Sequence, residues 1–130
     1  MKRRLARATS GLVLLALTAA CGGGGRAATT PSQPPSGDAT VTLTTGGVVP
    51  KNLTVAPGSQ VTFLNNDTRH HSMYSDPHPE HTDCPEFDSV GYLAPGERRQ
   101  TGNLNIVRTC GFHDHDDAGN PKWQGNIVIQ

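Results

Sequence analysis

The stretch Pro50-Lys-Asn-Leu-Thr-Val-Ala-Pro-Gly-Ser-Gln-Val-Thr-Phe-Leu-Asn-Asn-Asp67 decides the fold of this 130-residue chain. Its segment Asn52-Leu-Thr-Val55 is rich in residues that favour strands, and Ala56-Pro-Gly-Ser59 supplies the residues of a turn. A second strand candidate follows at Val61-Thr-Phe-Leu64, where alternate apolar side chains point to one face. Two short strands joined by a Pro-Gly turn therefore predict β structure in this part of the chain.

The rest of the domain also consists of short strand candidates separated by Gly and Pro turns. They lie at Thr40–Thr45, Ser89–Tyr92, Arg98–Gln100, Asn105–Val107 and Asn126–Val128. Between them, Asn65 to Phe87 form a long polar segment with three prolines and four of the six histidines, and segments of this length are usually functional. No helix with a 3.6-residue period is expected in the domain. The pattern predicts an all-β fold, either a sandwich or a Greek-key barrel.

The first 38 residues are expected to lie outside this domain. Residues 1–20 have the basic start and the short apolar run of a signal peptide, and Leu17-Thr-Ala-Ala-Cys21 resembles a bacterial lipobox, in which Cys21 is lipidated. The alternative is an ordinary signal peptide cleaved near Ala20. Residues 21–38 read as a flexible Gly, Pro, Ser and Thr linker, which leaves 39–130 for one domain. We expect a membrane-anchored lipoprotein of the bacterial cell envelope, facing the periplasm or the cell surface.

The charge balance and the missing motifs exclude several classes of function. Beyond Ala20 the chain has seven Lys+Arg against eleven Asp+Glu, a formal charge of −4, which argues against a nucleic-acid partner. The sequence has no Gly-x-Ser-x-Gly elbow, no phosphate-binding Gly loop and no His-Glu-x-x-His motif. We therefore expect a binding protein and not an enzyme.

Three motifs resemble the cupredoxins, the copper-binding family of plastocyanin and azurin. The run from Pro50 to Asp67, followed by histidine, is similar to the N-terminal half of that family. Cys110-Gly-Phe-His113 resembles its Cys-x-x-His ligand loop, and Trp123-Gln-Gly-Asn-Ile-Val-Ile129 resembles its closing strand. The resemblance implies a cupredoxin-like Greek-key β-sandwich over 39–130 with copper as cofactor, and it places the first copper ligand at His71. Trp123 stands where the family has an axial methionine.

The cysteines leave two alternatives open. Once Cys21 is lipidated, Cys84 and Cys110 are the remaining thiols, in a compartment that oxidises exposed pairs. A Cys84–Cys110 disulfide would tie the long polar segment to the C-terminal half and would contribute about 3 kcal/mol through loop entropy. In the other alternative, Cys110 is the thiolate ligand of a blue-copper site.

If the disulfide forms, a second alignment predicts the metal site. Cys110-Gly-Phe-His-Asp-His115 also resembles the His-x-His strand of cupredoxin-like domains related to multicopper oxidases. Strand alternation then puts His113 and His115 on one face, and His71 would join them in a three-nitrogen site suited to Cu(II) or Zn(II). The remaining candidates have supporting roles in this site. His78 and His81 are candidates for additional ligands, and Asp114 or Asp116 for orienting an imidazole.

The sequence therefore predicts a copper-binding, cupredoxin-like lipoprotein that handles copper or transfers electrons at the cell envelope. Copper handling is favoured where the thiolate is absent. The alternative is a metal-free, disulfide-stapled module of the same fold that binds a protein partner, which predicts dispersed histidines. A copper oxidase would need more than one domain. The expected partners are a copper ion, the membrane through the lipid anchor, and a redox or copper-transfer protein.

Overall fold

The structure is a computed structural model that describes residues 39–130 of the chain. The predicted signal peptide (1–20), the linker (21–38) and the lipidation of Cys21 lie outside the described residues. In the described part of the chain, no helix has both the length and the hydropathy that a membrane span requires.

One sheet contains four strands, and the sequence stretch that decides the fold supplies one of its central strands. The order across this sheet is β2 (Gly47–Val49), β1 (Ala39–Thr44), β4 (Val61–Asn65) and β7 (Arg98–Gln100). Strand β1 runs parallel to β4 and antiparallel to β2. Along β4, buried and half-buried residues alternate, because only one face of the sheet turns toward the core.

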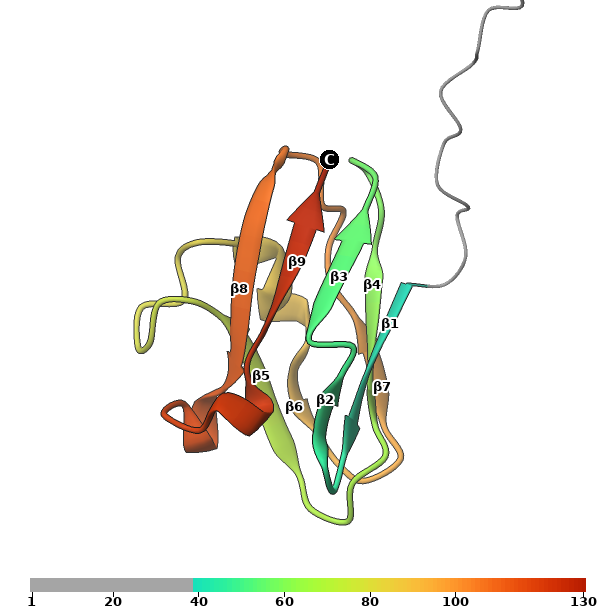
Figure 1. Ribbon diagram of the computed structural model, residues 1–130, viewed down its shortest axis with the longest axis vertical. Helices are drawn as coiled ribbons and strands as arrows, with labels where there is room; N and C mark the ends of the chain where they lie inside the picture. The colour runs from blue at the N-terminus through green and yellow to red at the C-terminus, as the bar shows by residue number, and fades with distance from the viewer. Residues whose placement is uncertain (1–38) are drawn as a thin grey trace, which may run out of the picture. The chain divides into compact units, whose positions relative to one another are not determined.

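The other sheet contains five strands, two of which carry a histidine, His71 and His113. Its order is β3 (Asn52–Val55), β9 (Gly125–Ile129), β8 (Arg108–Asp114), β5 (His71–Ser75) and β6 (Gly91–Leu93), as Figure 1 shows for the labelled strands. Strand β3 is parallel to β9, whereas β8 is antiparallel to both of its neighbours. The prediction of an all-β, two-sheet sandwich is confirmed.

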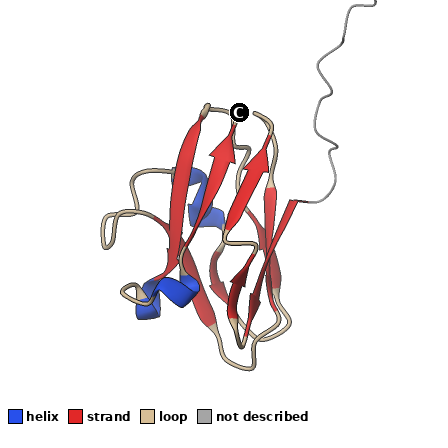
Figure 2. Cartoon of the chain, in the orientation of Figure 1, coloured by secondary structure: helices blue, strands red, loops and turns tan. Residues whose placement is uncertain are grey.

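Three short 3₁₀ helices lie in the connections between strands, as the blue segments in Figure 2 show. They are η1 (Pro85–Ser89), η2 (His115–Asp117) and η3 (Pro121–Trp123). Helix η2 begins directly after the last residue of β8, so the chain changes direction at His115.

An aromatic cluster fills the space between the two sheets. Phe63 of β4 packs edge-on against Phe87 and Phe112, with ring centroids 5.6 and 5.2 Å apart. All three rings are fully buried. Phe112 comes from β8 of the opposite sheet, so this contact joins the sheets and fixes which face of β8 turns inward.

One strand prediction was wrong and one was displaced. Asn105–Val107 is not a strand: Ile106 and Val107 are exposed in the bend before β8. The long polar segment 65–87 contains the strand β5, which begins at His71. The strand expected at Ser89–Tyr92 lies at Gly91–Leu93, since η1 extends to Ser89.

Candidate metal centre

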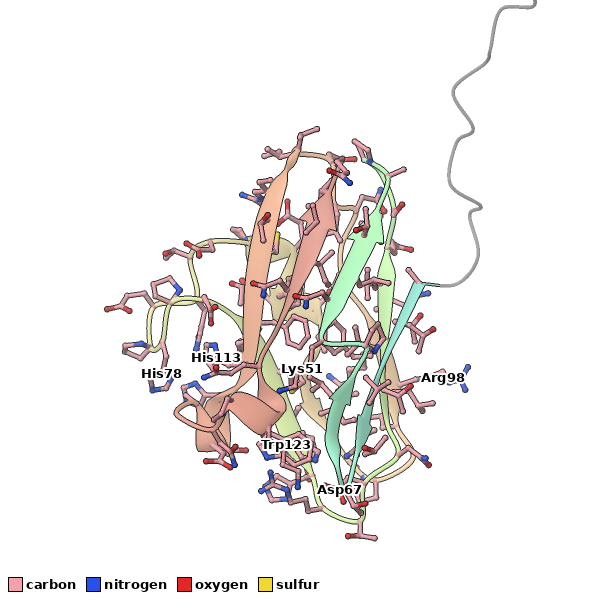
Figure 3. All side chains as sticks on the ribbon, in the orientation of Figure 1. Lys51, Asp67, His78, Arg98, His113 and Trp123 are labelled. Atoms are coloured by element: carbon pink, nitrogen blue, oxygen red, sulfur yellow. A yellow bond between two sulfur atoms is a disulfide. The ribbon has the colours of Figure 1, made fainter. Side chains whose placement is uncertain are left out.

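Four of the six histidines gather at one place. His78, His81, His113 and His115 each offer a ring nitrogen, and these four atoms lie within 4.8 Å of one another. His113 is buried, His81 is half-buried, and His78 and His115 are exposed. Figure 3 shows the labelled side chains of His78 and His113 close together beside β8. The group therefore reaches from the covered surface of the sheet to solvent.

Strand β8 supplies one half of the group because its side chains alternate between two faces. Cys110, Phe112 and Asp114 are buried, whereas His113 between them points to the other face, where residues 76–81 cover it. His115 follows at the start of η2 and lies with His113 in the cluster. The structure thus brings His113 and His115 together, as the His-x-His pattern predicts.

The loop that follows β5 supplies the other half. Its two ends are joined by a hydrogen bond from the Asp83 backbone N to the Asp76 carbonyl, 2.9 Å long. Within the loop, the His81 backbone N donates to the Pro77 carbonyl at 2.7 Å, and Ser75 Oγ donates to the His81 carbonyl at 3.1 Å. These bonds fold the loop back on itself and turn both of its imidazoles toward β8.

His81 has a backbone conformation that is uncommon for its residue type. Its φ angle is 54°, in the left-handed region that glycine adopts most readily. Non-glycine residues persist in this region where surrounding contacts hold them, often at functional sites. Tyr74 of β5 provides one such contact, because its ring stacks on His81 with centroids 4.6 Å apart and an interplanar angle of 21°.

His113 has one ring nitrogen paired and the other free. Its Nδ1 lies 2.6 Å from Oδ1 of Asp76, whereas its Nε2 is buried and has no hydrogen-bond partner among the described residues. An ionised carboxylate only accepts hydrogen bonds, so Nδ1 carries the proton and Nε2 of the neutral ring has a lone pair. A buried nitrogen without a partner is costly, and a metal ion would satisfy it.

The spacing of His81 and His115 fits a shared ion. Nε2 of His81 lies 3.2 Å from Nδ1 of His115. Nitrogens held tetrahedrally around one Zn(II)-sized ion, with bonds of about 2.0–2.1 Å, are about 3.3 Å apart. Copper and zinc both accept imidazole ligands. The residues present therefore fit the metal that the resemblance implies.

The pKa of His81 also reflects this arrangement. Burial lowers it below its ordinary value of 6.5, and the nearby His113, His115 and His78 lower it further, while Asp88 acts in the opposite direction. A lowered pKa keeps the His81 imidazole neutral near pH 7. A neutral imidazole is the form that ligates metals.

The prediction that His71 joins His113 and His115 is wrong. Tyr74 pairs with His113 across β5 and β8, so these two side chains share the outer face, and His71 points to the inner face, where it is fully buried. There its Nδ1 lies 2.7 Å from Oδ2 of Asp114, and its Nε2 lies 3.1 Å from Oδ2 of Asp67. Carboxylates thus occupy both ring nitrogens of His71.

A closed polar network surrounds His71. The pKa of Asp67 lies below its ordinary value of 3.8: burial, the largest single cause, raises it, but the hydrogen bonds from the Thr68 backbone N and from His71, together with the charges of His71 and Arg69, outweigh burial. Trp123 covers the network, with its ring centroid 4.3 Å from that of His71 and the Arg69 guanidinium 4.6 Å from the indole. Trp123 is buried, in agreement with a packing role.

The two residues predicted to orient an imidazole make no hydrogen bond to the four clustered histidines in the described part of the chain, although Asp114 does orient another imidazole. Asp114 holds His71, and Asp116 accepts a hydrogen bond from Ser72 Oγ at 3.0 Å. The carboxylate that contacts His113 belongs to Asp76, which the sequence analysis missed. No local motif links these two residues, because 37 positions separate them.

The two remaining cysteines form a disulfide. Cys84 and Cys110 are both fully buried and are joined with a Cα–Cα distance of 5.8 Å. The structure therefore agrees with the first of the two cysteine alternatives. The blue-copper alternative is wrong, because a disulfide sulfur is not a thiolate and Cys110 points to the inner face of β8.

Two carboxylates act on the clustered histidines. Asp76 contacts His113, and the charge of Asp88 acts on His81. Figure 3 places Arg98 on the side of the domain opposite His78 and His113. The charge of Asp76 and Asp88 therefore favours cations at the four histidines.

Solved structures support the fold, whereas the comparisons with family models and with curated proteins found no match. Among solved structures, a purple cupredoxin from Nitrosopumilus maritimus is 18% identical, with a TM-score of 0.55 over 72% of this chain and 100% of that one. An oxidized amicyanin variant is 13% identical, with a TM-score of 0.55 over 72% and 82% of the two chains. The Cu(I) form of another amicyanin variant is 14% identical, with a TM-score of 0.55 over 72% and 83%. At these identities the likeness establishes the architecture: the described domain has the cupredoxin fold.

Proposed function

We propose that this protein binds a copper ion through His78, His81, His113 and His115 and carries it at the cell envelope. The observation that carries the proposal is the convergence of four imidazoles, one of which, that of His113, has a buried Nε2 without a hydrogen-bond partner among the described residues. Imidazole ligands suit both copper and zinc. The copper form of amicyanin, a protein of similar fold, supports the choice of copper.

Transport of copper suits the ligand set better than electron transfer does. The four candidate ligands are all nitrogens, and Cys84 and Cys110 are oxidised to a disulfide, so neither can supply the thiolate of a blue-copper centre. Two of the ligands, His78 and His115, are exposed to solvent. Exposed ligands can be replaced one at a time by those of a partner protein, which is what transfer of a metal ion requires.

The metal-free alternative lacks support from the histidines. That alternative expects dispersed histidines and a disulfide-stapled domain that binds a protein partner. The disulfide is present, but four histidines converge. The carboxylates of Asp76, in contact with His113, and of Asp88, whose charge acts on His81, also favour a cation as the ligand.

The test is a copper titration of the full chain carrying Cys21→Ser, which prevents acylation. We expect one Cu(II) per chain, an EPR spectrum with nitrogen couplings, no intense thiolate band and no free thiol at Cys84 or Cys110. His113→Ala should abolish this binding, and His70→Ala should leave it unchanged, because His70 is exposed and outside the cluster. A chain that binds no copper, or whose His113→Ala variant binds it normally, contradicts the proposal.

The site of action rests on the N-terminal motif. We propose that Cys21 is acylated and that the domain is held at a membrane, since Leu17-Thr-Ala-Ala-Cys21 resembles a lipobox. Mass spectrometry of the protein expressed in a bacterium should find acyl chains on Cys21. Loss of membrane association in Cys21→Ser supports the anchor, and unchanged fractionation of that variant contradicts it.

A further inference from the structure

We propose that Asp76 positions the His113 imidazole of this centre and that Gly111, which has no side chain, leaves room for the Asp76 carboxylate. Together they would hold His113 with Nε2 facing the other three histidines, which makes His113 the anchoring ligand. This inference rests on the proposed function, because it assigns a role within the same metal site.

The contact itself sets the tautomer of His113. Oδ1 of Asp76 lies 2.6 Å from Nδ1 of His113 and accepts a charge-assisted hydrogen bond from the Nδ1–H group. The proton is thereby kept on Nδ1, and the lone pair on Nε2. The rings of His78 and His81 lie with their centroids 5.4 and 5.3 Å from that of His113. The free nitrogen of His113 is therefore ready to ligate before any metal arrives.

The backbone of Asp76 is fixed on the strand that carries His113. Its N donates to the Gly111 carbonyl at 3.0 Å, and its own carbonyl accepts from the Asp83 N at 2.9 Å. The carboxylate of Asp76 is about half exposed, so the backbone bonds and the contact with His113 hold it in place. Asp76 thus connects the first residue of the loop to β8.

Gly111 is required at this position for a steric reason. It lies two residues before His113 on β8, and therefore on the same outer face. A Cβ atom on residue 111 would overlap with Oδ2 and Cγ of Asp76. Any larger residue would displace the carboxylate from His113. The contact between Asp76 and His113 therefore depends on glycine at position 111.

The arrangement predicts an order among the ligands. Metal-bound histidines usually donate their second N–H to a carboxylate or carbonyl, and loss of that partner typically lowers metal affinity about 10- to 100-fold. Among the four histidines, His113 is the one whose ring is both buried and bonded to a carboxylate among the described residues. His113 should thus hold the ion while the exposed ligands exchange.

The test compares Asp76→Ala with Asp83→Ala, which removes the same charge from the same loop at a residue whose side chain makes no hydrogen bond or ion pair with the cluster among the described residues. In the metal-free protein, ¹⁵N NMR should find the His113 proton on Nδ1 in the wild type and in Asp83→Ala, and a mixture of tautomers in Asp76→Ala. Copper affinity, measured by competition with a chelator, should fall about 10- to 100-fold in Asp76→Ala and stay near the wild-type value in Asp83→Ala. Asp76→Asn should recover part of the affinity, because its amide oxygen still accepts the hydrogen bond.

Gly111→Ala completes a double-mutant cycle with Asp76→Ala. As a single change, Gly111→Ala should reduce copper affinity about as much as Asp76→Ala does. Combined with Asp76→Ala, it should reduce the affinity little further, because the Asp76 carboxylate that overlaps with the new Cβ atom is no longer present. Equal affinities of Asp76→Ala and Asp83→Ala, or an unchanged tautomer in Asp76→Ala, overturn the inference. A wild type that binds no copper overturns the proposed function instead, and the tautomer measurement still decides whether Asp76 orients His113.

Discussion

His71 and Asp114 form a buried pair on the inner face of the five-stranded sheet, with Nδ1 of His71 2.7 Å from Oδ2 of Asp114. One residue earlier on β8, His113 points to the opposite face and joins the candidate metal centre. The sheet therefore separates a structural charge network from a ligand cluster. Changes to the two sets of residues should have different effects.

His71→Leu should destabilise the protein without removing a copper ligand. It would leave the carboxylates of Asp67 and Asp114 without their buried partner, and breaking a buried pair in this way costs about 3–5 kcal/mol. Urea unfolding measures the loss, with the exposed His70→Gln as a control expected within about 0.5 kcal/mol of the wild type. Folded His71→Leu should still bind one copper ion. Lost copper binding in a folded variant would place His71 in the centre after all.

Removing the Cys84–Cys110 disulfide should lower the free energy of unfolding by about 3 kcal/mol. The bond joins residues 26 positions apart and restricts the unfolded chain, as loop-closure entropy describes. Urea unfolding of the double variant Cys84→Ala/Cys110→Ala measures the effect. The wild type unfolded in the presence of a reductant serves as the comparison and should lose a similar amount. A change below about 1 kcal/mol is incompatible with this expectation.

The metal-free protein should become more stable as pH rises through the range just below 6.5. Burial and the neighbouring histidines lower the pKa of His81 in the native state, so in this range the unfolded chain binds more protons than the native one. The free energy of unfolding therefore increases with pH there, and this contribution is complete above 6.5. Unfolding titrations at several pH values measure the slope.

His81→Asn is the matched variant for that experiment. Asparagine tolerates the left-handed backbone that His81 adopts, and it does not titrate. The pH dependence of the wild type should exceed that of His81→Asn in this range. Equal slopes would mean that His81 is not the titrating group.

Gly125→Ala should be destabilising, whereas Gly119→Ala should be close to neutral. A Cβ atom on residue 125 would overlap with the Lys51 carbonyl oxygen and the Phe112 ring, neither of which can move freely. Overpacking of this kind costs about 1–3 kcal/mol. No heavy atom lies within 4 Å of a Cβ built on Gly119. Thermal and urea unfolding of both variants check the difference, and equal stabilities would be unexpected.

The part of the fold that could be predicted is the part with local signals. Strands β3 and β4 carry alternating apolar residues on either side of a Pro-Gly turn, and both formed where expected. Ile106 and Val107 gave a similar signal but are exposed, because apolar composition alone does not tell a strand from the bend before it. Strand β5 was not among the predicted strands because its residues are mostly polar. Its formation depends on pairing with β8, which no local pattern in β5 indicates.

The part of the candidate site that could be predicted also depends on local sequence signals. The nearness of His113 and His115 was expected from their spacing, although His115 begins η2 and does not continue β8. His71 lies outside the metal centre because the register of β5 and β8 sets Tyr74 opposite His113. That register cannot be predicted from the sequence of either strand alone. Likewise, Asp76 reaches His113 only because the loop folds back across 37 residues.

The negative charge of Asp76 and Asp88 beside the four histidines has a kinetic consequence. A surface of one sign raises the local concentration of oppositely charged ions and speeds their capture, and salt screens this attraction over a Debye length of about 8 Å at physiological ionic strength. Scarce copper ions would therefore reach the four histidines faster from dilute solution than from concentrated salt. The same field would repel anionic copper complexes, so the chemical form in which the metal arrives would decide how quickly the protein is loaded.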